Sequence, residues 1–244
     1  MEARVGLVTG GTRGIGAAIC HELAARGTAV AFTYRSDADR ARQVAAELEQ
    51  RGGRVVALPF DLDQPADAVR LVEDTVKHLG GLHSLVLNAG VWDGGRIEAI
   101  DPAAWWSVIH TNLGGALHVV RAALPALRAA EQASVTFVSS AVGLIGFPGD
   151  TAYASVKAAM VGFARSLAKE VAADGIRVNV LAPGFVDTDM TAAISARARE
   201  QIAGEIVLGR FGTADEIARA AAFLAEEATY CTGTVLTVDG GWTL

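Results

Sequence analysis

The sequence contains few of the residues that build disulfide scaffolds or metal sites. Its 244 residues include two cysteines and five histidines, and the histidines fall at separate places along the chain. Two cysteines are too few for a disulfide framework, and the histidines lack the spacing of metal ligands. We therefore predict no metal site and a reducing, cytoplasmic environment.

Long apolar runs and basic stripes are also absent. No apolar run approaches membrane-spanning length, and strand-like residues begin at Arg4, which leaves no room for a signal peptide. The formal net charge is −6, and no basic stripe with interleaved aromatic residues occurs. We therefore expect neither a membrane nor a nucleic acid as a partner.

Aromatic residues are scarce at 6%, whereas 51% of the residues are hydrophobic, mainly Ala, Val and Leu. This composition suits parallel strands buried beneath helices that are rich in small residues. No Pro/Ser-rich linker or run of charge divides the chain, and its length fits one large α/β domain. The prediction is a single domain over residues 1–244.

The stretch from Ser139 to Lys157 carries the strongest chemical signal. Tyr153 and Lys157 stand four residues apart on one face of a predicted helix that Thr151 can cap. A free phenol has a pKa of roughly 10, and a buried ammonium beside it, joined by an oxidised nicotinamide, stabilises the phenolate. The hydroxyl of Ser140 follows a predicted strand and can bond a substrate carbonyl. Such a pair on a solvated helix is, however, commonly structural.

The start of the chain reads as strand, glycine loop and helix. A strand predicted at residues 5–9 leads into glycines at positions 10, 14 and 16, and a helix follows to Ala25. Glycines let the backbone approach a pyrophosphate, whose charge meets the amide groups at the helix N-terminus. This arrangement favours dinucleotide binding over an ordinary strand-to-helix turn.

The residues after the second strand indicate which nicotinamide cofactor binds. That strand is predicted at residues 28–33, and no acidic residue follows it where an NAD-specific protein would use one. Arg35 and Arg13 can instead bind a 2′-phosphate, although either can be a solvated arginine. We predict NADP(H).

Two further strand ends carry polar or small residues. Asp61 follows a strand predicted at residues 54–58, and it can accept from the adenine amine or cap a helix that begins near Pro65. Asn88-Ala-Gly90 follows a strand at residues 84–87 and suits close passage beneath a dinucleotide.

The second half of the chain holds several irregular features. Asn112 lies inside a predicted helix, either to distort it and hold a water beside Lys157 or as a plain polar contact. Pro125 is expected to kink or end that helix. Pro183-Gly184 follows a strand at residues 176–181 and opens a predicted substrate lid at about 185–208. Thr213 and Glu216 form a capping box for a helix to Glu227, and a last strand is predicted at 234–238.

Taken together, these motifs resemble the short-chain dehydrogenase/reductase family over essentially the whole chain. The resemblance implies a single-domain α/β Rossmann fold with a seven-stranded, doubly wound parallel sheet and helices on both faces. It implies Tyr153 as general acid/base, Ser140 orienting the carbonyl, Lys157 holding the nicotinamide ribose and Asn112 positioning a proton-relay water. The residues that carry the likeness are Thr9-Gly-x-x-x-Gly14-x-Gly16, Asp61, Asn88-Ala-Gly90, Asn112, Ser140, Tyr153-x-x-x-Lys157, Pro183-Gly184 and Thr188.

The resemblance also implies the cofactor and substrate contacts. Cofactor contacts are expected from the glycine loop, the strand ends and the helix of Tyr153, namely Gly10, Thr12, Arg13, Gly14, Ile15, Gly16, Arg35, Asp61, Leu62, Asn88, Ala89, Gly90, Tyr153, Lys157, Pro183, Gly184, Val186 and Thr188. An apolar substrate pocket is expected from Trp92, Ile145, Phe147, Phe185 and Met190, with Trp242 nearby. Thr188 is expected to bind the carboxamide.

Within the family, the chain is most similar to 3-oxoacyl-(acyl-carrier-protein) reductases. Those reductases carry basic residues for the acidic carrier where this chain has Glu131 and Asp174, so we expect carrier-linked substrates not to be favoured. The predicted function is NADPH-dependent reduction of a ketone, either a 3-oxoacyl thioester or a polyketide-type or cyclic ketone. The alternative is a catalytically silent NADP-binding protein. The family, together with small-residue faces at 113–116 and 158–162, predicts a homotetramer.

Overall fold

The computed structural model describes residues 3–64 and 66–244. Its centre is a parallel sheet of seven strands in the order β3-β2-β1-β4-β5-β6-β9. The order reverses between β1 and β4, which is the switch point of a doubly wound sheet. The prediction of the fold is therefore confirmed. The strands are β1 (Val5–Val8), β2 (Ala29–Tyr34), β3 (Val55–Pro59), β4 (Ser84–Leu87), β5 (Ser134–Val138), β6 (Arg177–Pro183) and β9 (Val235–Val238).

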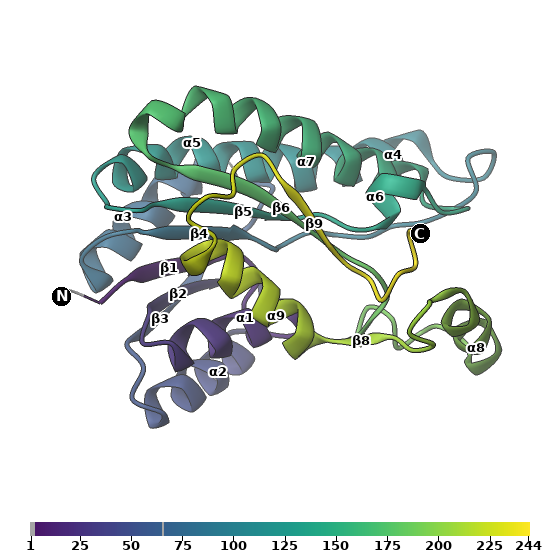
Figure 1. Cartoon of the computed structure of the whole chain (residues 1–244), viewed down its shortest axis with the longest axis horizontal. Coiled ribbons are helices and arrows are strands. Elements are labelled where there is room, and N and C mark those ends of the chain that lie inside the picture. Colours follow the sequence, from purple (N-terminus) through teal and green to yellow (C-terminus); the bar gives the residue numbers. More distant parts are fainter. Residues whose placement is uncertain (1–2, 65) are drawn as a thin grey trace.

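Helices cover both faces of the sheet (Figure 1). One layer holds α1 (Gly14–Ala25), α2 (Ala38–Gln50) and α9 (Ala214–Ala222); the other holds α3 (Asp67–Leu79), α4 (Pro102–Ile109), α5 (Gly115–Arg128) and α7 (Thr151–Glu170). Successive strand residues such as Leu7 and Val8 point to opposite faces, and both are fully buried in two separate hydrophobic clusters. Burial on both faces explains why the strands read as continuous apolar runs.

The long helix predicted after Pro102 is interrupted. A π-helical turn, η1 (His110–Gly114), lies between α4 and α5 and contains Asn112. Pro125 does not end the helix, since α5 continues to Arg128. The predicted start of the preceding helix near Pro65 falls on a residue outside those described, and α3 begins at Asp67.

The region after β6 leaves the main sheet. There β7 (Val186–Asp187) pairs with β8 (Gly212–Thr213), and α8 (Ala196–Glu205) projects at one end of the molecule (Figure 1). Short elements elsewhere are α6 (Val142–Ile145) and the 3-10 turn η2 (Ala172–Asp174). The predicted capping box of Thr213 and Glu216 is present, and α9 ends in the π-helical turn η3 (Phe223–Glu227).

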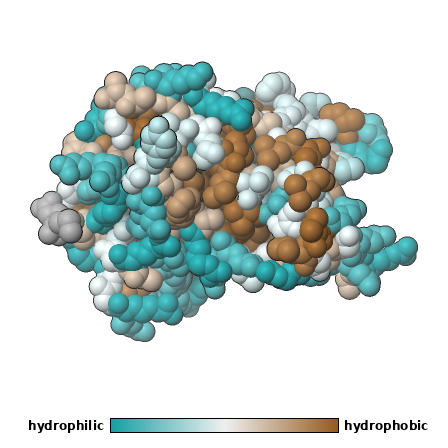
Figure 2. Space-filling view, in the orientation of Figure 1, coloured by the Kyte–Doolittle hydropathy of each residue, from teal (hydrophilic) through white to brown (hydrophobic). Residues whose placement is uncertain are grey.

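The surface is polar over most of the view in Figure 2, but hydrophobic residues gather over β9 and toward the C-terminus. Strand β9 is an edge strand, because it pairs with β6 on one side only. Val207, Leu208 and Leu244 are among the exposed large hydrophobic residues. Within the described ranges, no helix is both long and apolar enough to cross a bilayer.

Candidate active site

The glycine loop between β1 and α1 forms a cradle of backbone groups. Gly10 and Gly14 have φ angles of 71° and 53°, which favour glycine. A Cβ at Gly16 would lie 2.0 Å from the Gly10 carbonyl oxygen, so only glycine fits there. The N-terminus of α1 receives no side-chain cap, which leaves amide donors for a ligand. These features fit the pyrophosphate of a dinucleotide.

Threonine hydroxyls and Asn88 fix the loop against the neighbouring strands. Thr9 Oγ1 accepts from the backbone N–H groups of Asn88 (3.0 Å) and Ala89 (2.9 Å), and Thr33 Oγ1 accepts from Gly10 N–H (2.9 Å). The Asn88 amide donates to the carbonyls of Thr9 (3.1 Å) and Gly10 (3.2 Å). Asn88 therefore shapes the cradle from below.

Two arginines stand free beside this cradle. Arg13 and Arg35 are exposed and form no ion pair with any described residue. Arg40, at the start of α2, donates from Nε to the Thr12 carbonyl at 3.2 Å and so ties α2 to the loop. The guanidinium donors of Arg13 and Arg35 suit a phosphate.

Asp61 lies just beyond β3, as predicted, and its carboxylate accepts from Asp63 N–H at 3.1 Å. Asp63 in turn accepts from the Thr111 hydroxyl at 2.6 Å. This turn places Leu62 against α5, where a Cβ at Gly115 would lie 2.6 Å from Leu62 Cδ2. Asp61 therefore organises the turn, and its contact with adenine stays a prediction.

Lys157 and Tyr153 occupy one face of α7, opposite the end of β5. Lys157 is 4% exposed, its Nζ donates to the Val138 carbonyl at 2.8 Å, and it lies 5.3 Å from the centre of the Tyr153 ring. Burial lowers the pKa of Lys157 to about 8. The same burial, reinforced by the charge of Asp150, raises the pKa of Tyr153 to about 12.

The direction of the Tyr153 shift is opposite to the one that we expected from the lysine. Loss of water around the phenol, and the nearby charge of Asp150, both oppose the phenolate and raise the pKa of Tyr153. At neutral pH the phenol therefore keeps its proton. A protonated phenol is the form that a proton donor needs.

Ser140 and Ser139 follow β5 and face different partners. Ser140 Oγ accepts from Val142 N–H at 3.2 Å, and its own O–H has no acceptor among the described residues. It can donate to a substrate oxygen. Ser139 is buried, and its hydroxyl donates to the Lys157 carbonyl at 2.7 Å, which holds the Tyr153 helix against the sheet.

The predicted helix cap by Thr151 is wrong, because Asp150 occupies the cap position and Thr151 is the first helical residue.

Asn112 sits in the π-helical turn and is 1% exposed. Its Oδ1 accepts from Val91 N–H at 2.7 Å, and its Nδ2 donates to the Val91 carbonyl at 2.8 Å. The predicted distortion of the helix is therefore present, and its visible effect is to clamp the segment that follows β4. A role in holding a water stays a prediction.

The predicted pocket residues divide into two sets. Phe147 and Phe185 are partly buried and pack with Trp242, with ring centres 4.8 to 6.0 Å apart. They therefore form a small aromatic cluster with Trp242, and Phe185 itself belongs to the segment predicted as a lid. Trp92, Ile145 and Met190 are each more than half exposed.

The segment after β6 reaches back to the glycine loop. A Cβ built on Gly14 would lie 3.4 Å from Thr188 Cγ2, and Val186 is buried in the cluster that includes α1. Pro183 ends β6, and Gly184 packs against Asp239. Thr188 therefore lies against the glycine loop, and its contact with the carboxamide stays a prediction.

Comparison with known proteins agrees with this geometry. The enoyl-(acyl carrier protein) reductase family model matches residues 10–243. The chain belongs to the short-chain dehydrogenase/reductase family. The 3-oxoacyl-[acyl-carrier-protein] reductase of Haemophilus influenzae is 38% identical over 242 residues, which cover 99% of this chain and 98% of that protein. The Escherichia coli enzyme of that name is 39% identical over 241 residues, covering 98% and 97%.

Solved structures of the short-chain dehydrogenase/reductase family superimpose closely. A dehydrogenase/reductase from Sinorhizobium meliloti has a TM-score of 0.94 at 35% identity, covering 100% of this chain and 96% of that one. A short-chain dehydrogenase from Burkholderia cenocepacia in complex with NADP has a TM-score of 0.93 at 34% identity, covering 100% and 99%. A blue fluorescent protein from a metagenomic library, in complex with NADPH, has a TM-score of 0.92 at 35% identity, covering 99% and 98%. The predictions of the family and of an oxidoreductase are confirmed.

Four residues that shape this family site were not predicted to do so. Thr33, Ser139 and Asp150 were given no role, and Thr9 was noted only as part of a motif. Each forms a hydrogen bond with a residue between 18 and 80 positions away. Hydroxyl residues directly at strand ends were the available signal for Thr9, Thr33 and Ser139. For Asp150, the signal was a carboxylate three residues before Tyr153.

Proposed function

We propose that this protein is an NADPH-dependent ketone reductase that also runs in reverse as a secondary-alcohol dehydrogenase. The observation that carries the proposal is that the helix of Tyr153 and the buried Lys157 is bonded to the end of β5, directly beside Ser140, whose O–H has no acceptor among the described residues. NADP(H) as the cofactor agrees with the two relatives described with NADPH and NADP, and with the unpaired Arg13 and Arg35.

The side chains would act in a defined order. The bound reduced nicotinamide supplies the hydride. Ser140 donates a hydrogen bond to the carbonyl oxygen of the substrate and holds it beside Tyr153. As the hydride reaches the carbonyl carbon, Tyr153 transfers its proton to that oxygen, and the alcohol forms. Lys157 places a positive charge beside the phenolate that remains.

The net charge of −6, rather than Glu131 and Asp174, supports a substrate that is not linked to an acidic carrier protein. Asp174 accepts from Arg128 at 2.8 Å, so this carboxylate is neutralised, while Glu131 is exposed. Both residues precede the amino ends of β5 and β6, whereas the Tyr153 site follows the other end. Within one chain, these two carboxylates therefore lie at the opposite end of the sheet from Tyr153. They would repel an acidic carrier only at a distance from the site.

We propose that free ketones, or thioesters on short coenzyme A mimics, are reduced at least as efficiently as the same group on acyl-carrier protein. The decisive experiment measures NADPH oxidation with a panel of ketones, then kcat/KM for both thioester forms at low and high salt. A tenfold preference for the carrier that fades with salt would contradict the proposal. Failure of every ketone and thioester would favour the alternative of a silent NADP-binding protein.

We also propose a homotetramer in the cytoplasm, built from one domain over residues 1–244 with a lid at about 185–208. A Cβ at Gly114 or at Gly162 would meet open space, so these glycines leave the outer faces of η1 and α7 flat rather than packing onto the sheet. Flat faces of this kind allow a second copy to approach closely. A monomeric mass by light scattering at micromolar concentration would contradict the tetramer.

A further inference from the structure

Asp150 has an unusual setting at the start of α7. It occupies the cap position of a 20-residue helix, but its carboxylate accepts no hydrogen bond from the helix N–H groups. Its Oδ1 instead accepts from the indole N–H of Trp92 at 2.8 Å. The backbone of Asp150 is fixed on both sides, since its N–H donates to Phe147 and its carbonyl accepts from Ala154. The carboxylate is therefore turned away from the helix, toward the loop that follows β4.

That loop is held firmly against the start of α7. Gly95 N–H donates to the Gly149 carbonyl at 2.8 Å, and the Trp105 indole donates to the Thr151 hydroxyl at 3.1 Å. A Cβ on Gly94 would lie 3.1 Å from Asp150 Oδ1, so backbone closely approaches the carboxylate. Two indoles thus fix two successive residues, and the Asp150 side chain has a defined orientation.

Asp150 occupies the cap position of the helix on which Tyr153 is the third residue, so both side chains lie in the first turn at the same end of α7. The charge of Asp150 adds to burial in raising the pKa of the Tyr153 phenol. Burial also raises the pKa of Asp150 itself, and the Trp92 hydrogen bond only partly opposes this. Water is therefore partly excluded around both groups, and charge acts more strongly there than on an open surface.

No described cation neutralises Asp150. Arg96, on the same loop, pairs with Glu98 at 2.7 Å, and Lys157 is buried on the other side of Tyr153 with the Val138 carbonyl as its partner. Asp93 adds a second negative charge, but it is exposed. Among the described residues, the neutral indole is the one hydrogen-bond partner of the Asp150 carboxylate, which leaves Oδ2 as an acceptor.

We propose that Asp150 is a specificity-determining residue that sets a fixed negative charge beside the substrate carbonyl. It favours ketones that carry an ammonium or another hydrogen-bond donor near the carbonyl, and it disfavours ketones that carry a carboxylate there. This inference rests on the proposed reductase function. It extends that function by naming the charge of the substrates that the site accepts.

The test uses three ketones with one carbon skeleton, which end in a carboxylate, a neutral amide or an ammonium. The wild-type enzyme is expected to show at least a tenfold lower kcat/KM for the carboxylate than for the amide, and the highest value for the ammonium. In Asp150→Asn, we expect the carboxylate to gain at least fivefold relative to the amide and the ammonium to lose at least fivefold. A purely structural role would change all three values in the same direction.

Two matched variants complete the design. Asp93→Asn removes the same charge from the same loop at an exposed position, and it should leave the three ratios unchanged. Trp92→Phe keeps the ring and removes the indole donor, so the discrimination should persist because the carboxylate remains. If Asp150→Asn folds, reduces the amide and keeps the wild-type ratios of kcat/KM among the three ketones, the inference is wrong while the reductase function stands. If the wild type reduces none of the three, the proposed function itself fails.

Discussion

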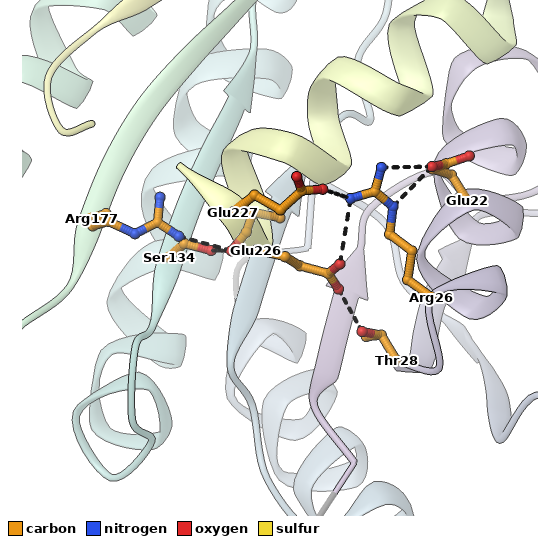
Figure 3. A network of polar contacts seen from close by, with 8 residues as sticks. Glu22, Arg26, Thr28, Ser134, Arg177, Glu226 and Glu227 are labelled. Carbon is orange, nitrogen blue, oxygen red and sulfur yellow. Dashed lines mark hydrogen bonds and ion pairs between the residues drawn. The ribbon is translucent and has the colours of Figure 1, made fainter. Parts of the chain in front are cut away.

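The two ends of the central sheet treat charge in opposite ways. At the amino ends of the strands, charged side chains bond to one another or to carbonyl groups in a closed network (Figure 3). At the carboxyl ends, Lys157 is buried with a single carbonyl partner, and Arg13 and Arg35 have no acidic partner among the described residues, whereas Arg40 pairs with Glu47. The amino ends thus carry mostly paired polar groups, although Arg4 Nε and Ser84 Oγ are buried there without a hydrogen-bond partner, and the carboxyl ends keep cationic groups without acidic partners.

The network at the amino ends joins elements that are far apart in sequence. Arg26, which follows the last residue of α1, contacts Glu22, Glu226 and Glu227, and Glu226 accepts from the Thr28 hydroxyl at 2.5 Å (Figure 3). Nearby, Arg177 donates to the carbonyls of residues 224, 225 and 228, which end the π-helical turn η3. These contacts attach the last helix to the first helix and to β6.

The contrast shows which polar groups stabilise and which are kept for chemistry. Paired groups recover in the folded state much of the solvation that burial removes. The Lys157 ammonium recovers less of its solvation, because burial lowers its pKa. Keeping this ammonium buried therefore reduces the stability of the fold. Strongly perturbed groups of this kind concentrate at functional sites. Substitutions at the amino ends should therefore lower stability, and those at the carboxyl ends should lower activity.

The largest expected effect is on turnover at the carboxyl end. Tyr153→Phe should lower kcat for ketone reduction by about a thousandfold, because only the donated proton is lost. The melting temperature should change by less than about 2 °C. The matched control is Tyr230→Phe, which alters a fully exposed tyrosine and should leave kcat unchanged. Retention of more than about a tenth of wild-type turnover in Tyr153→Phe would show that another group is the acid.

At the amino end, Arg177→Ala should destabilise the fold without changing kcat. Three partly buried carbonyls lose a charged donor, so we expect a loss of about 3 kcal/mol in the free energy of unfolding. Urea unfolding followed by circular dichroism measures it, with the exposed Arg121→Ala as control. If Arg177→Ala and Arg121→Ala had the same free energy of unfolding, the polar contacts at the amino ends of the strands would not be the stabilising ones.

Lys157→Met should sharpen the comparison through pH. Burial lowers the pKa of Lys157 from 10.5 to about 8, so the folded state disfavours the proton. The wild type therefore loses stability as the pH falls from 10.5 to 8. Relative to Lys157→Met, it should gain about 2 kcal/mol between about pH 7 and pH 9.5.

Urea unfolding at the two pH values measures this gain. Lys77→Met, at an exposed position of α3, should show no such pH dependence relative to the wild type. A flat difference between the wild type and Lys157→Met would mean that the ammonium is well solvated in the folded protein.

The smallest effect concerns an arginine without a partner. Arg35→Asp should weaken NADPH binding at least about tenfold more than NADH binding, because it replaces a phosphate partner with a like charge. Fluorescence titration of both cofactors gives the two Kd values, with the exposed Arg51→Asp as control. A wild-type protein that already prefers NADH would contradict the assignment of Arg35.

Local signals were enough to predict most elements. The strands at 84–87 and 134–138 and the capping box at Thr213 were located correctly, because apolar runs and capping residues act within a few positions. The cap at Thr151 was predicted wrongly, and of the two effects predicted for Pro125, a kink or an end of the helix, the end does not occur. Proline ends a helix only where neighbouring packing does not support it, and α5 packs against α3 and the sheet.

By itself, the sequence determined the doubly wound fold, the family and the presence of Tyr153, Lys157, Ser140 and the glycine loop, since each depends on residues close together in the chain. Tertiary structure decided how these groups behave. Burial, which no local pattern reveals, raises the pKa of Tyr153 and lowers that of Lys157. The hydrogen bond between Trp92 and Asp150 joins residues 58 positions apart, and the one between Val91 and Asn112 joins residues 21 positions apart. Only the folded chain brings such residues together, because electrostatics and hydrogen bonds depend on distance in space.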